Sequence, residues 1–231
     1  MTIFSSPFRA LVIGSSGTIG AAFVSLLTAT PSCAMVLGIH RHSNPSIDYQ
    51  IPNSIEAAAQ ELLNQGPFQL IINTIGVLHS ENWMPEKKLA DLNFDQLNTL
   101  MQINAIGPAL TLKYFAKLLD PAGSVMAIIS AKVGSIEDNR LGGWYSYRAS
   151  KAALNMFIKT AAIEFGRVMP NTAIIALHPG TVNSKLSKPF KGEQIGRPPA
   201  DAARDMFQVI QTINKENSGS FLSYSGEKLP W

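Results

Sequence analysis

The feature that most constrains the fold is the alternation, along the whole chain, of short apolar runs with segments of helical periodicity. Most of the apolar runs contain no alternating polar residues, which is typical of parallel strands that helices cover on both faces. Strands are expected at residues 10–13, 34–39, 46–49, 68–73, 125–130, 172–177 and 220–224, and helices at 19–27, 53–63, 94–119, 146–168 and 201–213. This order predicts an α/β fold with a doubly wound parallel sheet of about seven strands and helices on both faces.

The length of 231 residues predicts one domain, residues 1–231, because the chain contains no internal repeat and no linker-like stretch. An apolar content of 46% with 15% charged residues favours a compact globule over a disordered chain. Only residues 41–45 separate the second and third expected strands, which is too few for a crossover helix. The helix between these two strands is therefore expected to be reduced or absent.

Charge and apolar patterning exclude several classes of protein. The net charge of +3 is small and no block of like charges occurs, so no nucleic-acid partner is predicted. The apolar segment 10–27 is interrupted by glycine and serine, so neither a signal peptide nor a membrane span is expected. The single cysteine, Cys33, fits a reducing interior and lies in no metal-binding pattern. A cytoplasmic protein without a metal site is predicted.

Three glycines, Gly14, Gly17 and Gly20, stand between the first expected strand and the first expected helix. A backbone without side chains lets a pyrophosphate approach the helix N-terminus, where free N–H groups and the helix dipole favour an anion. The position of these glycines predicts a dinucleotide-binding Rossmann fold. The alternative is that they are ordinary turn glycines.

The end of the second expected strand predicts which dinucleotide binds. An NAD site usually has a carboxylate there to hold the ribose 2′-hydroxyl, but the sequence reads His40-Arg41-His42. The guanidinium of Arg41 suits a 2′-phosphate, so NADP(H) is predicted. A solvated basic loop is the alternative.

Tyr147 and Lys151 lie four residues apart at the start of the helix expected at 146–168, so their side chains share one helix face. A phenol has an ordinary pKa near 10, and a neighbouring ammonium is expected to lower the pKa of Tyr147 towards neutrality. This pair predicts a proton-transfer site.

Two asparagines interrupt apolar segments. Asn104 lies inside the helix expected at 94–119, and Asn73 ends the fourth expected strand, at the sheet edge where ligands bind in this architecture. A core asparagine bonded to the backbone is the alternative for each. Together with Tyr147 and Lys151, Asn104 is interpreted as a catalytic residue.

These motifs resemble the short-chain dehydrogenase/reductase superfamily, and within it the C-factor-like branch, over essentially the whole chain. The resemblance implies that Tyr147, Lys151 and Asn104 are catalytic. It implies an adenine contact for Asp48 and a nicotinamide contact for the segment after His178. The cofactor-binding residues it implies, with those predicted above, are Gly14, Ser16, Gly17, Thr18, Ile19, Gly20, Arg41, Asp48, Asn73, Thr74, Gly76, Tyr147, Lys151, Pro179, Gly180, Val182 and Ser184.

The chain departs from the family pattern at three places. Thr18 occupies the position where the second loop glycine is usual, and Gly17 directly precedes it. Thr74 stands where the family has an asparagine. The family's catalytic serine lies three residues before the glycine equivalent to Gly134, and that residue is Ala131. Ser130 is predicted to orient the substrate in its place, if the strand end twists it into the site; Ser135, or neither serine, is the alternative.

The predicted function is hydride transfer between NADP(H) and a carbonyl or alcohol, with Tyr147 as the acid–base. The alternatives are an NADP(H)-binding sensor or C-factor-like signalling protein with weak or no catalysis, or a nucleotide-binding structural subunit. The segment 184–199 is expected to close over the substrate. The helix at 146–168 has two apolar faces, and the family resemblance implies a homodimer or homotetramer.

Overall fold

The computed structural model describes residues 7–231, so the first six residues of the predicted domain lie outside the described part. Six parallel strands form one sheet in the order β2-β1-β3-β4-β5-β6. Their bounds are β1 Phe8–Ile13, β2 Cys33–Ile39, β3 Leu70–Asn73, β4 Ser124–Ile129, β5 Thr172–His178 and β6 Phe221–Ser223. The predicted α/β fold with a doubly wound parallel sheet is confirmed.

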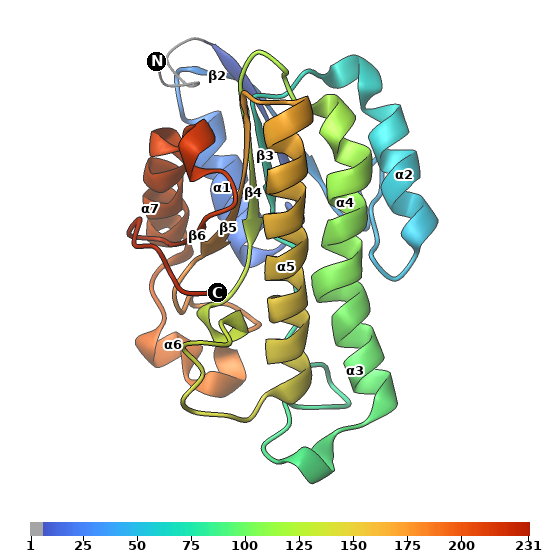
Figure 1. The fold of residues 1–231 in the computed structure, drawn as a ribbon, viewed down its shortest axis with the longest axis vertical. Coiled ribbons are helices and arrows are strands. Elements are labelled where there is room, and N and C mark those ends of the chain that lie inside the picture. The colour runs from blue at the N-terminus through green and yellow to red at the C-terminus, as the bar shows by residue number, and fades with distance from the viewer. Residues whose placement is uncertain (1–6) are drawn as a thin grey trace.

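Helices cover both faces of this sheet (Figure 1). Their bounds are α1 Thr18–Thr28, α2 Pro52–Glu61, α3 Phe94–Met101, α4 Gly107–Phe115, α5 Tyr145–Val168, α6 Gly192–Ile195 and α7 Pro199–Thr212. Side chains of α2, α4 and α5 form one buried apolar cluster with one sheet face, and side chains of α1 and α7 form another with the opposite face. The central strands are buried on both faces, which explains their continuous apolar sequence.

The strand expected at residues 46–49 is absent, and this lowers the count from about seven to six. Ile47 and Tyr49 are buried while Ser46 is exposed, so these residues alternate in burial although they form no strand. The backbone has no partner strand, because the N–H and C=O of Asp48 are both bonded to Ser54 Oγ, at 2.8 and 2.9 Å. Residues 41–45 contain no helix, as expected, but α2 connects β2 to the next strand of the sheet.

The helix expected at 94–119 is interrupted where Asn104 lies. α3 runs into a π-helical segment, Gln102–Ile106, which leads directly into α4. A π-helical turn widens the helix, and such turns occur frequently at functional sites. No helix within residues 7–231 is long and apolar enough to span a bilayer.

The chain order of the strands places a ligand site at one edge of the sheet. β1 lies between β2 and β3. After β1 the chain forms β2 on one side of it and then forms β3 on its other side. The crevice beyond the carboxyl ends of such strands is where ligands bind in open α/β sheets. The loops that follow β1, β3, β4 and β5 meet there.

Candidate active site

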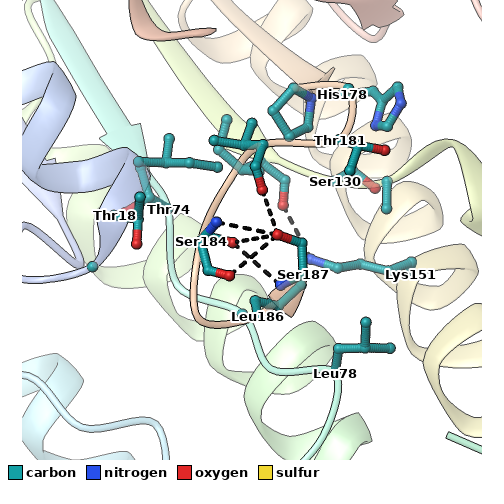
Figure 2. A pocket seen from close by; sticks show the side chains of 18 of the residues that line it. Thr18, Thr74, Leu78, Ser130, Lys151, His178, Thr181, Ser184, Leu186 and Ser187 are labelled. Atoms are coloured by element: carbon teal, nitrogen blue, oxygen red, sulfur yellow. Dashed lines mark hydrogen bonds between the residues drawn. The ribbon is translucent and has the colours of Figure 1, made fainter. Parts of the chain in front are cut away.

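A cavity of about 570 Å³ opens at this carboxyl edge (Figure 2). Its walls come from segments far apart in the sequence: the loop after β1, the loop after β3, the end of β4, the start of α5 and the segment after β5. Most of the predicted site residues line it, namely Ser16, Gly17, Thr18, Ile19, Gly20, Thr74, Gly76, Ser130, Tyr147, Lys151, Pro179, Gly180, Val182 and Ser184.

The N-terminus of α1 faces this cavity and is free to bind an anion. Gly17 is the N-cap residue and provides no side-chain cap, and the first turn contains no acidic residue. The backbone N–H groups of this turn and the positive end of the helix dipole are therefore available to a phosphate. This geometry fits the pyrophosphate of a dinucleotide.

Two of the glycines allow this loop to pack closely. Gly14 has φ +85°, a conformation that residues with a side chain rarely adopt. A Cβ on Gly20 would lie 2.2 Å from the carbonyl oxygen of Gly14. The loop therefore requires glycine at both positions. This requirement favours a phosphate-binding loop over the alternative of ordinary turn glycines.

Tyr147 and Lys151 lie on one face of α5 and are both nearly inaccessible to solvent. Lys151 Nζ donates to the carbonyl oxygen of Ile129 at 3.1 Å and lies 5.9 Å from the centre of the Tyr147 ring. Burial lowers the pKa of Lys151 from 10.5 to about 8. The predicted cooperation of these two side chains is therefore geometrically possible.

The expected lowering of the pKa of Tyr147 is not found. Burial raises the pKa of this phenol above its ordinary value, because desolvation disfavours the phenolate. The ammonium of Lys151 is bonded to a backbone carbonyl and lies too far from the ring to outweigh that effect. In this structure Tyr147 is a protonated phenol at neutral pH.

Asn104 is completely buried, and its side chain bonds the loop after β3 to α5. Its amide bonds both backbone groups of Val77, donating to the C=O and accepting from the N–H at 2.8 Å each. Its Nδ2 also lies 3.1 Å from Ser150 Oγ. The Asn104 amide lies beside the cavity rather than lining it, and it fixes the wall that contains Gly76.

The three candidate positions for a substrate-orienting hydroxyl differ clearly. Ser130 lines the cavity, but its hydroxyl donates to Asn155 Oδ1 on α5 at 2.6 Å. Ala131 also lines the cavity and packs in the apolar cluster around Tyr147. Ser135 bonds the backbone of Trp231 and is not among the cavity-lining residues. Ala131 therefore occupies the wall beside Tyr147 without offering a hydroxyl.

The segment after β5 forms one wall of the cavity, and its closure over a substrate stays a prediction. Figure 2 shows the hydroxyl groups of Ser184 and Ser187 bonded to each other and to nearby backbone. Leu186, Phe190 and Ile195 from the same segment line the cavity. The segment is anchored by backbone hydrogen bonds from Arg197 N to Thr181 O and from Asn183 N to Arg197 O.

Four predicted cofactor residues do not line the cavity. Gly14 belongs to the loop after β1 but does not line the cavity, and Arg41 is exposed just after the end of β2. Asp48 accepts from Gln50 N at 2.9 Å. The amide of Asn73 donates to the buried Tyr49 hydroxyl at 2.7 Å, so this asparagine bonds within the core.

Sequence reasoning missed an aromatic wall beside Tyr147. The ring of Trp144 lies 4.9 Å from that of Phe190 and 6.1 Å from that of Tyr147, centre to centre. Phe190 lies 43 residues after Tyr147 in an irregular segment, so no local pattern connects them. Trp144 lies only three residues before Tyr147, so it was the sequence signal for an aromatic side chain near the phenol.

His178 was also missed as a site residue. It lines the cavity, and its Nδ1 is buried without a hydrogen-bond partner. Burial, followed by the charge of Lys132, lowers the pKa of His178 to about 4, so the imidazole is neutral at pH 7. Residues 7–231 contain no cluster of three or more His, Cys, Asp or Glu side chains that could hold a metal ion.

The chain is similar in sequence to several known proteins. The family model described as enoyl-(acyl carrier protein) reductase matches residues 40–215. A 1-hydroxy-2-glutathionyl-2-methyl-3-butene dehydrogenase of Rhodococcus sp. (strain AD45) is 33% identical over 190 residues, 81% of this chain and 79% of that protein. The C-signal protein of Myxococcus xanthus is 33% identical over 168 residues, 72% of this chain and 94% of that protein.

Solved structures share the fold. The NADPH-bound carbonyl reductase from chicken fatty liver superposes with a TM-score of 0.83 at 23% identity, covering 98% of this chain and 100% of that one. The carbonyl reductase Sniffer of D. melanogaster gives the same TM-score at 19% identity, with the same coverage. The chain belongs to the short-chain dehydrogenase/reductase superfamily and to its C-factor-like branch, as the sequence resemblance predicted.

Proposed function

We propose that this protein is an NADP(H)-dependent oxidoreductase that reduces a carbonyl compound, or oxidises the corresponding alcohol. The observation that carries the proposal is that Tyr147 and Lys151 line the same cavity as the uncapped N-terminus of α1. A proton donor and an anion-binding helix end in one cavity are what hydride transfer from a dinucleotide requires.

The residues around the cavity would hold the cofactor along its length. The first turn of α1 would bind the pyrophosphate, and Arg41 would pair with the 2′-phosphate. Pro179, Gly180, Val182 and Ser184 would hold the nicotinamide amide. Bound NADPH would supply the hydride, and several structural neighbours, including the chicken carbonyl reductase, contain NADPH or NADP.

Tyr147 would supply the proton in reduction. Its raised pKa keeps the phenol protonated at neutral pH, so it can donate a hydrogen bond to a carbonyl oxygen and then a proton to the alkoxide. Lys151 would hold the positive charge beside the ring as the phenol loses its proton. Asn104 would keep the opposite wall in place through Val77.

The substrate half of the cavity favours an apolar carbonyl compound. Ala131, Val133, Trp144, Leu186 and Phe190 form its wall, and none of the residues that line the cavity is Asp or Glu. Burial of an apolar substrate body against these side chains would supply most of the binding free energy. Ketones and aldehydes with aromatic or branched aliphatic groups are the class to test.

A second candidate function is an NADP(H) sensor with weak catalysis. Ala131 favours it, because a hydroxyl that would orient the carbonyl is missing beside Tyr147. The C-signal relative is consistent with a signalling role for a protein of this fold.

NADPH oxidation across a panel of apolar ketones and aldehydes separates the two functions. Turnover with at least one carbonyl, together with NADPH binding, supports the reductase. Tight NADPH binding without turnover of any compound supports the sensor.

We also propose a homodimer or homotetramer in the cytoplasm. The outer surface of the π-helical segment and α5 exposes Ile106, Met156, Phe157 and Ile163, a set of apolar side chains that a second copy would cover. Light scattering at micromolar concentration tests this, and a monomer would contradict it.

A further inference from the structure

The turn that leads into α5 has an unusual backbone. Gly142, Gly143 and Trp144 all have positive φ, at 63°, 63° and 52°. Glycine adopts this conformation freely, but a bulky residue such as Trp144 rarely does. Trp144 is also the N-cap residue of α5 and provides no side-chain cap. Contacts from outside the turn must therefore hold it.

Arg148 Nε bonds the carbonyl oxygens of Gly142 and Gly143, and Glu86, which lies 60 residues before Ser146 in the chain, bonds the turn from outside α5. Its carbonyl oxygen accepts from Trp144 N at 2.5 Å. Its carboxylate accepts from Ser146 N at 3.2 Å and from the hydroxyl of Ser146. Glu86 thus binds the first turn of α5 through three hydrogen bonds and replaces the missing local cap.

The burial of this carboxylate makes the arrangement specific. Glu86 is only 2% exposed, and no ion pair found among residues 7–231 includes it. A buried carboxyl group without an ion-pair partner needs hydrogen bonds, and the first turn of α5 supplies them. The backbone two residues before Glu86 is bonded to α3, because Gln96 Nε2 donates to Met84 O at 3.1 Å.

The turn that Glu86 holds carries two functional parts of the cavity. Tyr147 immediately follows Ser146, and the Trp144 ring packs 6.1 Å from the Tyr147 ring and 4.9 Å from that of Phe190. A shift of the turn would therefore move both the phenol and the aromatic wall. Misplacing reacting groups by about 1 Å can cost about 100-fold in rate.

We propose that Glu86 is a positioning residue for the reaction: its buried carboxylate fixes the Trp144–Tyr147 turn and so places the phenol and the aromatic wall against the substrate. The inference rests on the proposed reductase function. A merely stabilising cap would instead affect the unfolding temperature without a selective effect on turnover.

The test compares Glu86→Ala and Glu86→Gln with the wild type, using the best carbonyl substrate from the panel. The Ala variant leaves the Ser146 N–H and hydroxyl buried without their acceptor. Glutamine keeps the length of the side chain and one acceptor oxygen, and the Ser146 hydroxyl can turn to accept from its amide. Ser146→Ala removes one bond only. Asn214→Ala is the matched control, because it removes a helix cap far from the cavity. The Asn214 side chain accepts from Glu216 N at 2.8 Å.

Glu86→Ala should lower kcat about 10- to 100-fold while the Kd of NADPH, measured by fluorescence, changes less than about twofold. Glu86→Gln should recover most of kcat, Ser146→Ala should fall between the two, and Asn214→Ala should match the wild type. Near-ultraviolet circular dichroism should show a changed Trp signal in Glu86→Ala and a wild-type signal in Glu86→Gln.

Three results would overturn the proposal: an unchanged kcat in Glu86→Ala, a Glu86→Gln variant as slow as Glu86→Ala, or an equal loss of NADPH affinity and turnover. If Glu86→Ala does not fold, Glu86→Gln and Ser146→Ala still test the proposal. A wild-type kcat in Ser146→Ala together with a slow Glu86→Gln would contradict the positioning role of Glu86. A wild-type protein without turnover on any carbonyl would contradict the reductase function instead.

Discussion

Replacing Asn104 by alanine tests how the cavity wall is held. The substitution removes the amide that bonds Val77 N and Val77 O at 2.8 Å each and lies 3.1 Å from Ser150 Oγ. Ser150 keeps its bond to Tyr147 O, so the loss falls on the two backbone groups of Val77. Each group left without its partner costs about 1–1.5 kcal/mol, so the free energy of unfolding should fall by about 2–3 kcal/mol.

Thermal and urea unfolding measure this loss. For a chain of this length, 2–3 kcal/mol corresponds to a decrease in Tm of about 5–10 °C. Asn98→Ala is the matched control, because Asn98 lies exposed on α3 and should change the free energy of unfolding by less than about 0.5 kcal/mol. If the two variants unfold at the same temperature, Asn104 does not hold the wall and this reasoning is refuted.

Three further predictions concern chemistry in and around the cavity. Ala131→Ser places a hydroxyl in the wall beside Tyr147 and should raise kcat about 10-fold or more in steady-state assays. An unchanged kcat would contradict the idea that Ala131 leaves the substrate carbonyl poorly oriented. Arg41→Ala should weaken NADPH binding about 10-fold and leave NADH binding unchanged in fluorescence titrations, and equal effects would contradict the 2′-phosphate contact. The pKa of His178 is about 4 when folded and 6.5 when unfolded, so between these pH values the unfolded chain binds the additional proton. Stability should therefore fall as pH drops from 6.5 to 4, by on the order of 3 kcal/mol in urea unfolding, and His178→Gln should show a shallower fall.

Local patterns predicted the parts of the site that lie close together in the sequence. The glycine loop follows the first strand directly, and Tyr147 and Lys151 are separated by one helical turn. In both cases the spacing alone determines the geometry, so the sequence was sufficient. Asn104 is buried and bonded to the backbone of Val77, which matches the alternative of a core asparagine, and its catalytic role stays a prediction.

Contacts between distant segments could not be predicted in this way. A strand was expected at residues 46–49, but Ser54 bonds both backbone groups of Asp48. Glu86 stands in a polar loop, and only the folded chain brings it to the start of α5. The direction of the pKa shift of Tyr147 was wrong because burial, which outweighs the charge of Lys151, was not visible in the spacing.

In the proposed reaction, Tyr147 donates the proton in NADPH-dependent carbonyl reduction. The most direct measurement is NADPH oxidation by Tyr147→Phe with a carbonyl substrate that the wild type reduces, alongside the Kd of NADPH for both proteins. Removing the hydroxyl should lower kcat about 100-fold or more while NADPH binds as before. Wild-type turnover in Tyr147→Phe would contradict the claim.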